Sequence, residues 1–248
     1  MKLLLLAMPN EIYGFHRFGV IPNLGIVSIA GNLPEGVDVK VADLVVIRDK
    51  AKQFVKDTVR RYKPDIVGLS CMTWQYPTAL KIAKMVKEMD REIKIVMGGY
   101  HPTIAYEEIA ESADKEYIDF IVRGEGELTT KELLLTLIKG GDFSEIDGLS
   151  YKTADNVFHH NRPRRPCDLR ELKLPNRGAR LLVDGFRALG RRIDVVETSR
   201  GCVFNCSFCC ITKMYGRCYR KFDLDRVIMD IEDAKKRGAG AILFTDDN

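Results

Sequence analysis

The sequence contains neither a long apolar run nor a block of like charges. Its apolar opening, MKLLLLAM, is shorter than a membrane span and meets Pro9 and Asn10 at once, so it predicts a buried strand rather than a signal peptide. The net charge of +4 is spread along 248 residues, which argues against an arm that binds nucleic acid. We therefore expect a globular protein with no membrane span and no nucleic-acid partner.

The sequence also lacks the two separated cysteine pairs that usually build a closed, four-ligand zinc site. Instead, Cys202, Cys206 and Cys209 fall within eight residues, although Cys210 or Cys218 could complete a zinc cage. Seven cysteines in an intracellular-looking chain favour metal ligands and free thiols over disulfides, so we expect a reducing, cytoplasmic location.

Three thiolates in one short loop can surround a single small metal centre, because thiolate is the usual protein ligand of iron–sulfur clusters. On a four-iron cluster they leave one iron without a protein ligand. An open metal position of this kind is where a substrate or cofactor binds. The three cysteines therefore predict a 4Fe-4S cluster.

The spacing Cys202-x3-Cys206-x2-Cys209, the aromatic Phe208 and the lead-in Arg200-Gly201 resemble the signature of the radical S-adenosylmethionine (SAM) superfamily. The resemblance implies that the open iron binds the amino and carboxylate groups of SAM. It further implies that an electron from the cluster cleaves SAM to a 5′-deoxyadenosyl radical, and that Phe208 belongs to the SAM site. The electron would come from an external one-electron reductant of the flavodoxin or ferredoxin type.

Residues 1–140 alternate strand and helix patterns. The strand patterns include continuous apolar runs, which are typical of parallel strands covered on both faces, and the intervening helices supply the crossovers that parallel strands need. We therefore predict an α/β fold in which residues 1–140 form a doubly wound, flavodoxin-like parallel sheet. The expected strands are residues 2–8, 37–42, 65–70, 93–98 and 117–122, and the expected helices are residues 24–33, 49–62, 77–89, 103–112 and 127–139.

Loops that contain glycine follow two of these strands, and in a doubly wound sheet the ligand lies beyond the carboxyl ends of the strands. Glycine lets the backbone approach a bulky ligand, although each glycine alone also fits an ordinary turn. The segments IPNLG (21–25), KPDIVGLS (63–70), MGGYHP (97–102) and VRGEGE (122–127) are similar, in this order, to the cobalamin-binding domain in front of many radical SAM proteins. The resemblance implies a cobalamin site made by Asn10, Ser70, Thr73, Gly98, Gly99, His101, Gly124 and Glu125.

One motif of such domains is incomplete here. Classical cobalamin domains carry Asp-x-His-x-x-Gly after the first strand, and the histidine becomes the lower ligand of cobalt, whereas this chain has GFHRFG at residues 14–19. His16 thus lacks the carboxylate that would fix the tautomer of a ligand histidine. We therefore favour a cobalamin site that does not use His16, with His101 lining the pocket through hydrogen bonds.

Residues 141–192 are predicted to form a hairpin and a linker, and residues 193–248 to begin a second domain. Two strands, at 193–198 and 241–245, flank a helix at 223–237. With the cysteine loop after the first strand, this is the start of the partial (β/α)6 barrel that the radical SAM resemblance implies.

In that barrel the end of the second strand approaches the amino group of SAM. Asp246 and Asp247 stand there and suit an ammonium group, although turn residues would look the same. One strand–helix unit takes about 30 residues, so residues 193–248 are too few for a six-unit barrel. The chain is therefore expected to be the N-terminal portion of a longer enzyme and to be inactive alone.

Together the two resemblances imply a cobalamin-dependent radical SAM enzyme. The expected reaction is methylation of an unactivated carbon through a 5′-deoxyadenosyl radical and methylcobalamin. Two alternatives stay open, a radical SAM cyclase or mutase that uses cobalamin, and a non-catalytic cobalamin or iron–sulfur sensor. The sequence specifies neither the substrate, a small molecule or a lipid, nor the catalytic residues.

Overall fold

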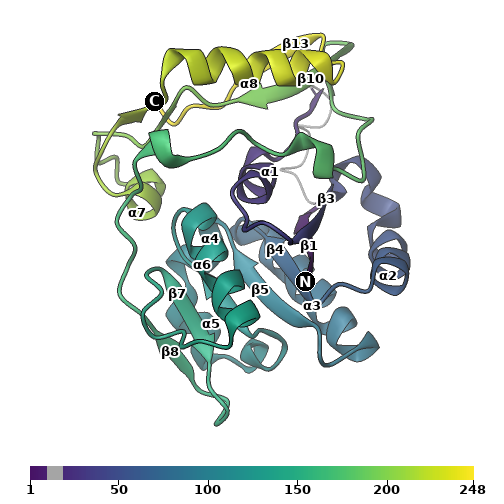
Figure 1. Cartoon of the computed structure of the whole chain (residues 1–248), viewed down its shortest axis with the longest axis vertical. Helices are drawn as coiled ribbons and strands as arrows, with labels where there is room; N and C mark the ends of the chain where they lie inside the picture. The colour runs from purple at the N-terminus through teal and green to yellow at the C-terminus, as the bar shows by residue number, and fades with distance from the viewer. Residues whose placement is uncertain (10–18) are drawn as a thin grey trace.

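The computed structural model describes residues 1–9 and 19–248, and its main feature is a seven-stranded sheet (Figure 1). Five parallel strands follow the order β3-β1-β4-β5-β6, and β7 and β8 add an antiparallel edge. Numbered along the chain, the parallel strands have the 2-1-3-4-5 order of flavodoxin-like folds, so the predicted doubly wound α/β fold is confirmed. The strands are β1 (Lys2–Ala7), β3 (Asp38–Asp43), β4 (Ile66–Ser70), β5 (Lys94–Gly98), β6 (Phe120–Val122), β7 (Leu149–Lys152) and β8 (Phe158–His160).

Strand β1 shows why the sheet is covered on both faces. Leu4 and Leu6 belong to an apolar core shared with α2, α3 and α5, whereas Leu3 and Leu5 belong to a second core shared with α1 and α6. Each of these leucines is at most 5% exposed, and burying such a side chain contributes about 1.5–3 kcal/mol to folding. The helices are α1 (Leu24–Gly31), α2 (Ala51–Tyr62), α3 (Tyr76–Met89), α4 (Tyr100–Ile104), α5 (Tyr106–Glu111) and α6 (Gly126–Lys139).

The segment between β5 and β6 differs from the prediction. Residues 103–112 were expected to form one helix, but the chain forms α4 and α5 with a break at Ala105, whose φ of −110° is not helical. Ser112 then ends α5 and caps a 3-10 turn, η4 (Ala113–Tyr117), by accepting a hydrogen bond from the amide of Asp114. Strand β6 therefore begins later than expected, at Phe120.

Short 3-10 turns complete the first half of the chain and the linker. They are η2 (Leu44–Lys50), η3 (Thr73–Gln75), η5 (Leu169–Glu171) and η6 (Arg177–Ala179). Among the residues that the structure describes, none of the helices has the length and apolarity that a bilayer crossing requires.

A second, smaller sheet contains the C-terminal strands in the order β13-β10-β9-β2. Strands β10 (Arg191–Val196) and β13 (Ala241–Phe244) are parallel and are connected through α8 (Leu224–Lys236), which is the strand–helix–strand unit expected from the sequence. Strand β9 (Arg187–Ala188) runs antiparallel to β10. A separate two-stranded ribbon of β11 (Ser199–Arg200) and β12 (Arg220–Lys221) brackets the cysteine loop and α7 (Ile211–Tyr215).

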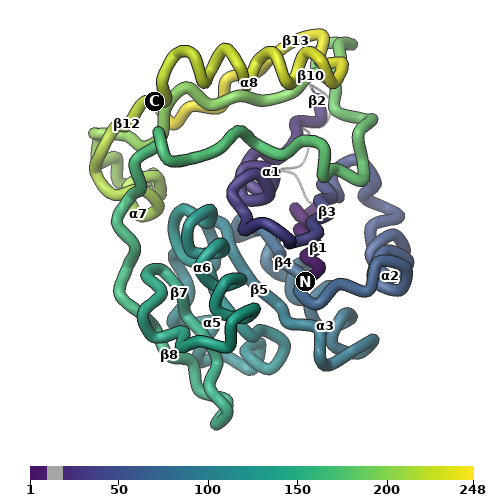
Figure 2. Tube along the Cα trace, viewed as in Figure 1, coloured from purple at the N-terminus to yellow at the C-terminus, as the bar shows by residue number. Residues whose placement is uncertain are grey.

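The edge of the second sheet comes from the other end of the chain. Strand β2 (Gly19–Val20) pairs antiparallel with β9, so a purple segment from the N-terminal part lies close to the C-terminal strands in Figure 2. A Cβ atom at Gly19 would lie 2.7 Å from the carbonyl oxygen of Arg187, so the close pairing requires glycine at this position.

Arg177 joins the linker to the second sheet from inside. Its side chain is fully buried, donates a hydrogen bond to the Val195 carbonyl oxygen at 2.7 Å and forms an ion pair with Asp230 of α8. Asp194 of β10 lies within 3.3 Å of the same guanidinium and also receives two hydrogen bonds from Arg180, at 2.6 and 3.0 Å. The linker is therefore fixed to both α8 and β10.

Candidate functional site

A cavity of about 340 Å³ lies between the main sheet and helices α1 and α6, at the carboxyl ends of the parallel strands. We call it the slot. It reaches the ends of β4, β5 and β6 at Ser70, Gly98 and Val122, and open α/β sheets bind ligands beyond the carboxyl ends of their strands. Its floor is apolar and is lined by Leu3, Leu5, Ile66, Val96, Leu133 and Leu134.

Glycines shape the slot at two positions. At Gly68 a Cβ atom would lie 2.6 Å from the Cδ2 atom of Leu5, so glycine lets β1 and β4 present a smooth apolar wall. Gly99 has a φ of +96°, and a Cβ atom there would lie 2.8 Å from the carbonyl oxygen of Cys71. The backbone turn between β5 and α4 therefore requires glycine at residue 99.

The structure brings five of the residues predicted to contact cobalamin to the slot. These are Ser70, Gly98, Gly99, Gly124 and Glu125. Asn10, like His16, lies outside the described residues. Thr73 and His101 are not among the described residues that line the slot. Thr73 is the first residue of η3, and His101 packs on the Tyr76 ring with the ring centroids 4.5 Å apart.

Tyr100 takes the place in the lining that the sequence analysis gave to His101. Burial, reinforced by the charge of Asp247, raises the pKa of Tyr100 to about 12, so its phenol stays protonated at neutral pH. Tyr215 of α7 also lines the slot, and burial raises its pKa as well. The sequence signal for Tyr100 was its place directly after Gly98 and Gly99.

Glu125, which the resemblance predicts to contact cobalamin, also forms a polar contact with the cysteine-loop ribbon. It lines the slot, but its side chain is only 6% exposed and holds two arginines. Oε1 accepts hydrogen bonds from Arg200 at 3.0 Å and from Arg220 at 3.1 Å, and Oε2 accepts a further one from Arg220 at 2.9 Å. Arg200 belongs to β11 and Arg220 to β12. Their bonds to Glu125 therefore connect the ribbon around the cysteine loop with the start of α6.

The cysteine loop begins at the end of β11, directly after Arg200. Cys202, Cys206 and Cys209 are free thiols; Cys206 is exposed and the other two are partly buried. Among the described residues no three His, Cys, Asp or Glu side chains are gathered into a metal-ligand set, so the three thiols have not converged in this conformation. Their chemistry fits an iron–sulfur cluster, because three unpaired soft ligands stand on one accessible loop.

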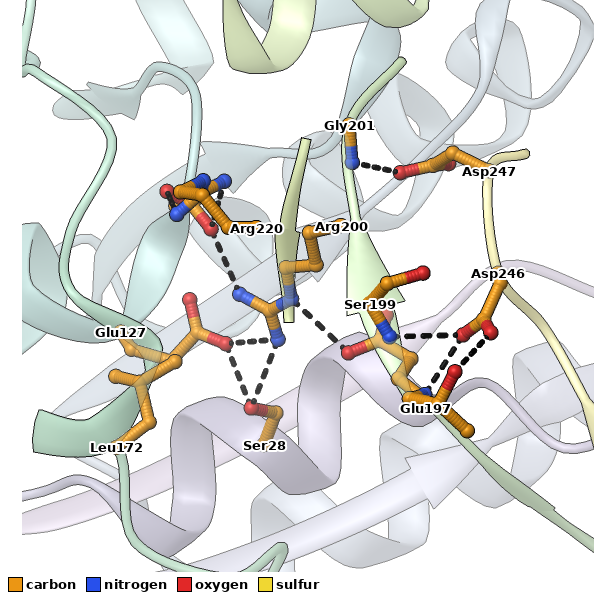
Figure 3. A network of polar contacts seen from close by, with 12 residues as sticks. Ser28, Glu127, Leu172, Glu197, Ser199, Arg200, Gly201, Arg220, Asp246 and Asp247 are labelled. Atoms are coloured by element: carbon orange, nitrogen blue, oxygen red, sulfur yellow. Dashed lines mark hydrogen bonds and ion pairs between the residues drawn. The ribbon is translucent and has the colours of Figure 1, made fainter. Parts of the chain in front are cut away.

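The residues predicted to bind SAM lie around the same loop. Phe208 is 90% exposed. Asp246 organises the strand end, because its Oδ1 atom accepts hydrogen bonds from the amides of Thr198 at 2.7 Å and Ser199 at 3.1 Å (Figure 3). Its Oδ2 atom accepts a hydrogen bond from the Thr198 hydroxyl.

Asp247 holds the next part of the loop. Its Oδ2 atom accepts a hydrogen bond from the Gly201 amide at 2.8 Å, and the residue also lines the slot (Figure 3). Burial raises the pKa of this carboxyl group. Of the two aspartates, Asp247 thus combines contact with the cysteine loop and a place in the slot lining.

Comparison with known proteins agrees with this arrangement. The model of the B12 binding domain family matches residues 11–134, half of the chain. The chain is 36% identical over its whole length to an uncharacterized methyltransferase of Pyrococcus horikoshii, of which it covers 53%. It is 30% identical over 75% of its length to the cobalamin-dependent radical SAM methyltransferase TokK of Streptomyces tokunonensis, of which it covers 28%. The chain therefore spans about half or less of these relatives.

The fold is also that of a solved enzyme. The cobalamin-dependent S-adenosylmethionine radical enzyme OxsB, with aqua-cobalamin and S-adenosylmethionine bound, superimposes on the whole chain with a TM-score of 0.79 at 20% identity, and the chain covers 34% of it. The chain belongs to the B12-binding-domain family.

Proposed function

We propose that this chain holds cobalamin in the slot and a 4Fe-4S cluster with SAM at the cysteine loop of an enzyme that methylates an unactivated carbon. The observation that carries the proposal is that both sites share one edge of the molecule. Three residues that line the slot also border the cysteine loop. Glu197 and Arg200 precede the loop in the chain, and Asp247 accepts a hydrogen bond from the Gly201 amide at its start. The same lining includes Ser70 and Gly98. When bound, cobalamin supplies methyl-transfer chemistry and the cluster supplies one-electron chemistry.

The slot suits the apolar part of a bulky cofactor whose large ring stays at the mouth. Its volume of about 340 Å³ falls in the range of small-molecule sites, and its floor consists of aliphatic side chains. At the mouth, the backbone of Gly98, Gly99 and Gly124 is free of side chains that would keep a large ring away. Ser70 and Tyr100 supply hydroxyl groups at the same level for polar substituents of the cofactor.

The cysteine loop supplies the second site. Cys202, Cys206 and Cys209 would hold three irons and leave the fourth for SAM. Asp247 and Glu197 stand beside the loop, and carboxylates in this place attract an ammonium group such as that of SAM. Phe208 offers an exposed aromatic face on the same loop. An external reductant of the flavodoxin or ferredoxin type would deliver the electron to this accessible side.

Anaerobic reconstitution tests the cluster assignment on the chain itself. We expect about four irons per chain and the broad visible absorption of thiolate-ligated iron. Cys202→Ala, Cys206→Ala and Cys209→Ala should each abolish both signals, whereas Cys71→Ala should leave them unchanged, since burial raises the pKa of this thiol to about 12. A site that bound zinc and required Cys210 would refute the assignment.

Analysis of the compounds formed from SAM tests the reaction. With SAM, a strong reductant and the substrate, methylation predicts both 5′-deoxyadenosine and S-adenosylhomocysteine, since one SAM is cleaved and another donates its methyl group. Formation of 5′-deoxyadenosine alone would favour ring formation or rearrangement. Absence of both products, with the cluster intact, would favour a sensor.

A further inference from the structure

The guanidinium of Arg200 lies among three carboxylates, two residues before the first cysteine of the loop (Figure 3). Nη1 donates to Oε1 of Glu125 at 3.0 Å, and Nη2 donates to Oε1 of Glu127 at 2.8 Å. Nε donates to Oε2 of Glu197 at 2.9 Å. Each edge of the planar guanidinium is therefore engaged, and two of the three carboxylates stand at the start of α6, which packs on the main sheet.

This cluster is removed from water. The side chains of Arg200, Glu125 and Glu127 are at most 6% exposed. Burial would raise the pKa of Glu127, but the charge of Arg200 and hydrogen bonds from Arg200 and Ser28 hold it below its usual value. Because an unpaired buried charge is costly, the carboxylates and the guanidinium hold one another in place.

The partners of Arg200 stand on the helices that wall the slot. Glu127 lies in the first turn of α6, and Ser28 of α1 donates to its Oε1 atom at 2.6 Å. The same helices line the slot, α1 with Ile29 and α6 with Leu133. A ligand in the slot thus touches the two helices that hold the guanidinium.

We propose that Arg200 is a positioning residue that couples occupation of the slot to the order of the cysteine loop. The inference deepens the proposed function and rests on it for the identity of the ligand. A ligand that fixes α1 and α6 also fixes Glu127 and, through it, the backbone of β11 from which the loop leaves. Coupling of this kind is reciprocal, so an ordered loop also favours the ligand-bound slot.

Hydrogen–deuterium exchange of the whole chain, with and without hydroxocobalamin, tests the coupling. In the wild type, hydroxocobalamin should slow exchange at the strand ends, residues 98–104, and at the loop, residues 199–210. In Arg200→Met, loop exchange without ligand should rise at least about tenfold, because Glu127 and Glu197 lose the cation that pairs with them. Hydroxocobalamin should then still protect residues 98–104 but no longer the loop.

Two variants serve as controls. Arg180→Met removes a buried arginine that forms two hydrogen bonds with Asp194 away from the slot, and it should leave the coupling intact. Arg200→Lys keeps the charge but lacks the planar fork that directs separate nitrogens at the three carboxylates, so it should fold and still lose the coupling. If Arg200→Met does not fold, Glu127→Gln makes the same comparison, because it replaces one buried carboxylate with a neutral amide of the same shape.

The outcomes separate this inference from the proposed function. Ligand-dependent protection of the loop that persists in Arg200→Lys and Glu127→Gln overturns the coupling while leaving cobalamin binding in place. If hydroxocobalamin protects no segment of the wild type, the proposed ligand is wrong. Even then, exchange of residues 199–210 without ligand tests whether Arg200 positions the loop. If that exchange rate is the same in the Arg200 variants as in the wild type, Arg200 does not position the loop.

Discussion

Gly98→Val should make the protein slightly more stable and unable to bind cobalamin tightly. Gly98 ends strand β5 with ordinary strand backbone, and a Cβ atom there would meet nothing closer than the Val122 carbonyl oxygen at 3.7 Å. Glycine costs a strand roughly 0.5–1 kcal/mol relative to alanine, and valine suits strands. The melting temperature should therefore stay constant or rise by about 2–4 °C.

The added methyl groups of Gly98→Val enter the slot. Overfilling a closely packed site costs about 1–3 kcal/mol, so the affinity for hydroxocobalamin should fall roughly 5- to 150-fold. Titration followed by visible absorption measures the affinity, and thermal unfolding followed by circular dichroism measures the stability. Gly240→Val is the matched control, because a Cβ atom at Gly240 also makes only an ordinary contact, 3.5 Å from the Arg192 carbonyl oxygen, and lies away from the slot. Unchanged affinity in a folded Gly98→Val protein would refute the placement of cobalamin in the slot.

Three further predictions concern stability and the lower cobalt ligand. Arg177→Met should destabilise the chain by about 3–5 kcal/mol in urea unfolding, because it leaves Asp230 buried without its cation. Burial would raise the pKa of Asp194, but hydrogen bonds and charge from Arg180 and the charge of Arg177 hold it below its usual value. The contribution of Asp194 to stability is therefore present at neutral pH and is lost as the pH falls through the lowered pKa. The stability gap between wild type and Asp194→Asn should accordingly shrink on acidification, and a constant gap would contradict the pairing. In His16→Ala the visible spectrum of bound cobalamin should match that of the wild type, whereas a shifted spectrum would identify His16 as a cobalt ligand.

The parts of the fold that could be predicted are those indicated by the spacing of apolar residues within one segment. The continuous apolar run of β1 predicts a strand covered on both faces, and Leu3 and Leu4 do pack into opposite cores. The break at Ala105 escaped prediction because residues 103–112 keep helical spacing on both sides of it. The spacing of apolar residues does not reveal a single non-helical residue, here Ala105, within such a stretch.

The candidate site divides in the same way. The three cysteines and the glycines at the strand ends were visible because their chemistry depends on short spacing. The pairing of Arg200 with Glu125 was not, because the partners are 75 residues apart and meet only in the folded chain. From the sequence, Asp246 was a candidate for the SAM site or an ordinary turn residue, and its hydrogen bonds with the backbone of Thr198 and Ser199 could not be foreseen, because those residues are 48 and 47 positions earlier.

The pairing of β2 with β9 has a consequence for how the chain is made. Gly19 leaves the ribosome long before its partner Ala188, and synthesis at about 5–20 residues per second separates the two by roughly 10–30 s. During that interval the helices and strands of the main sheet can assemble, but the segment that carries β2 has no strand to join. The nascent chain must therefore keep this edge unpaired until the linker emerges, so the second sheet can close only after the main sheet has been synthesised.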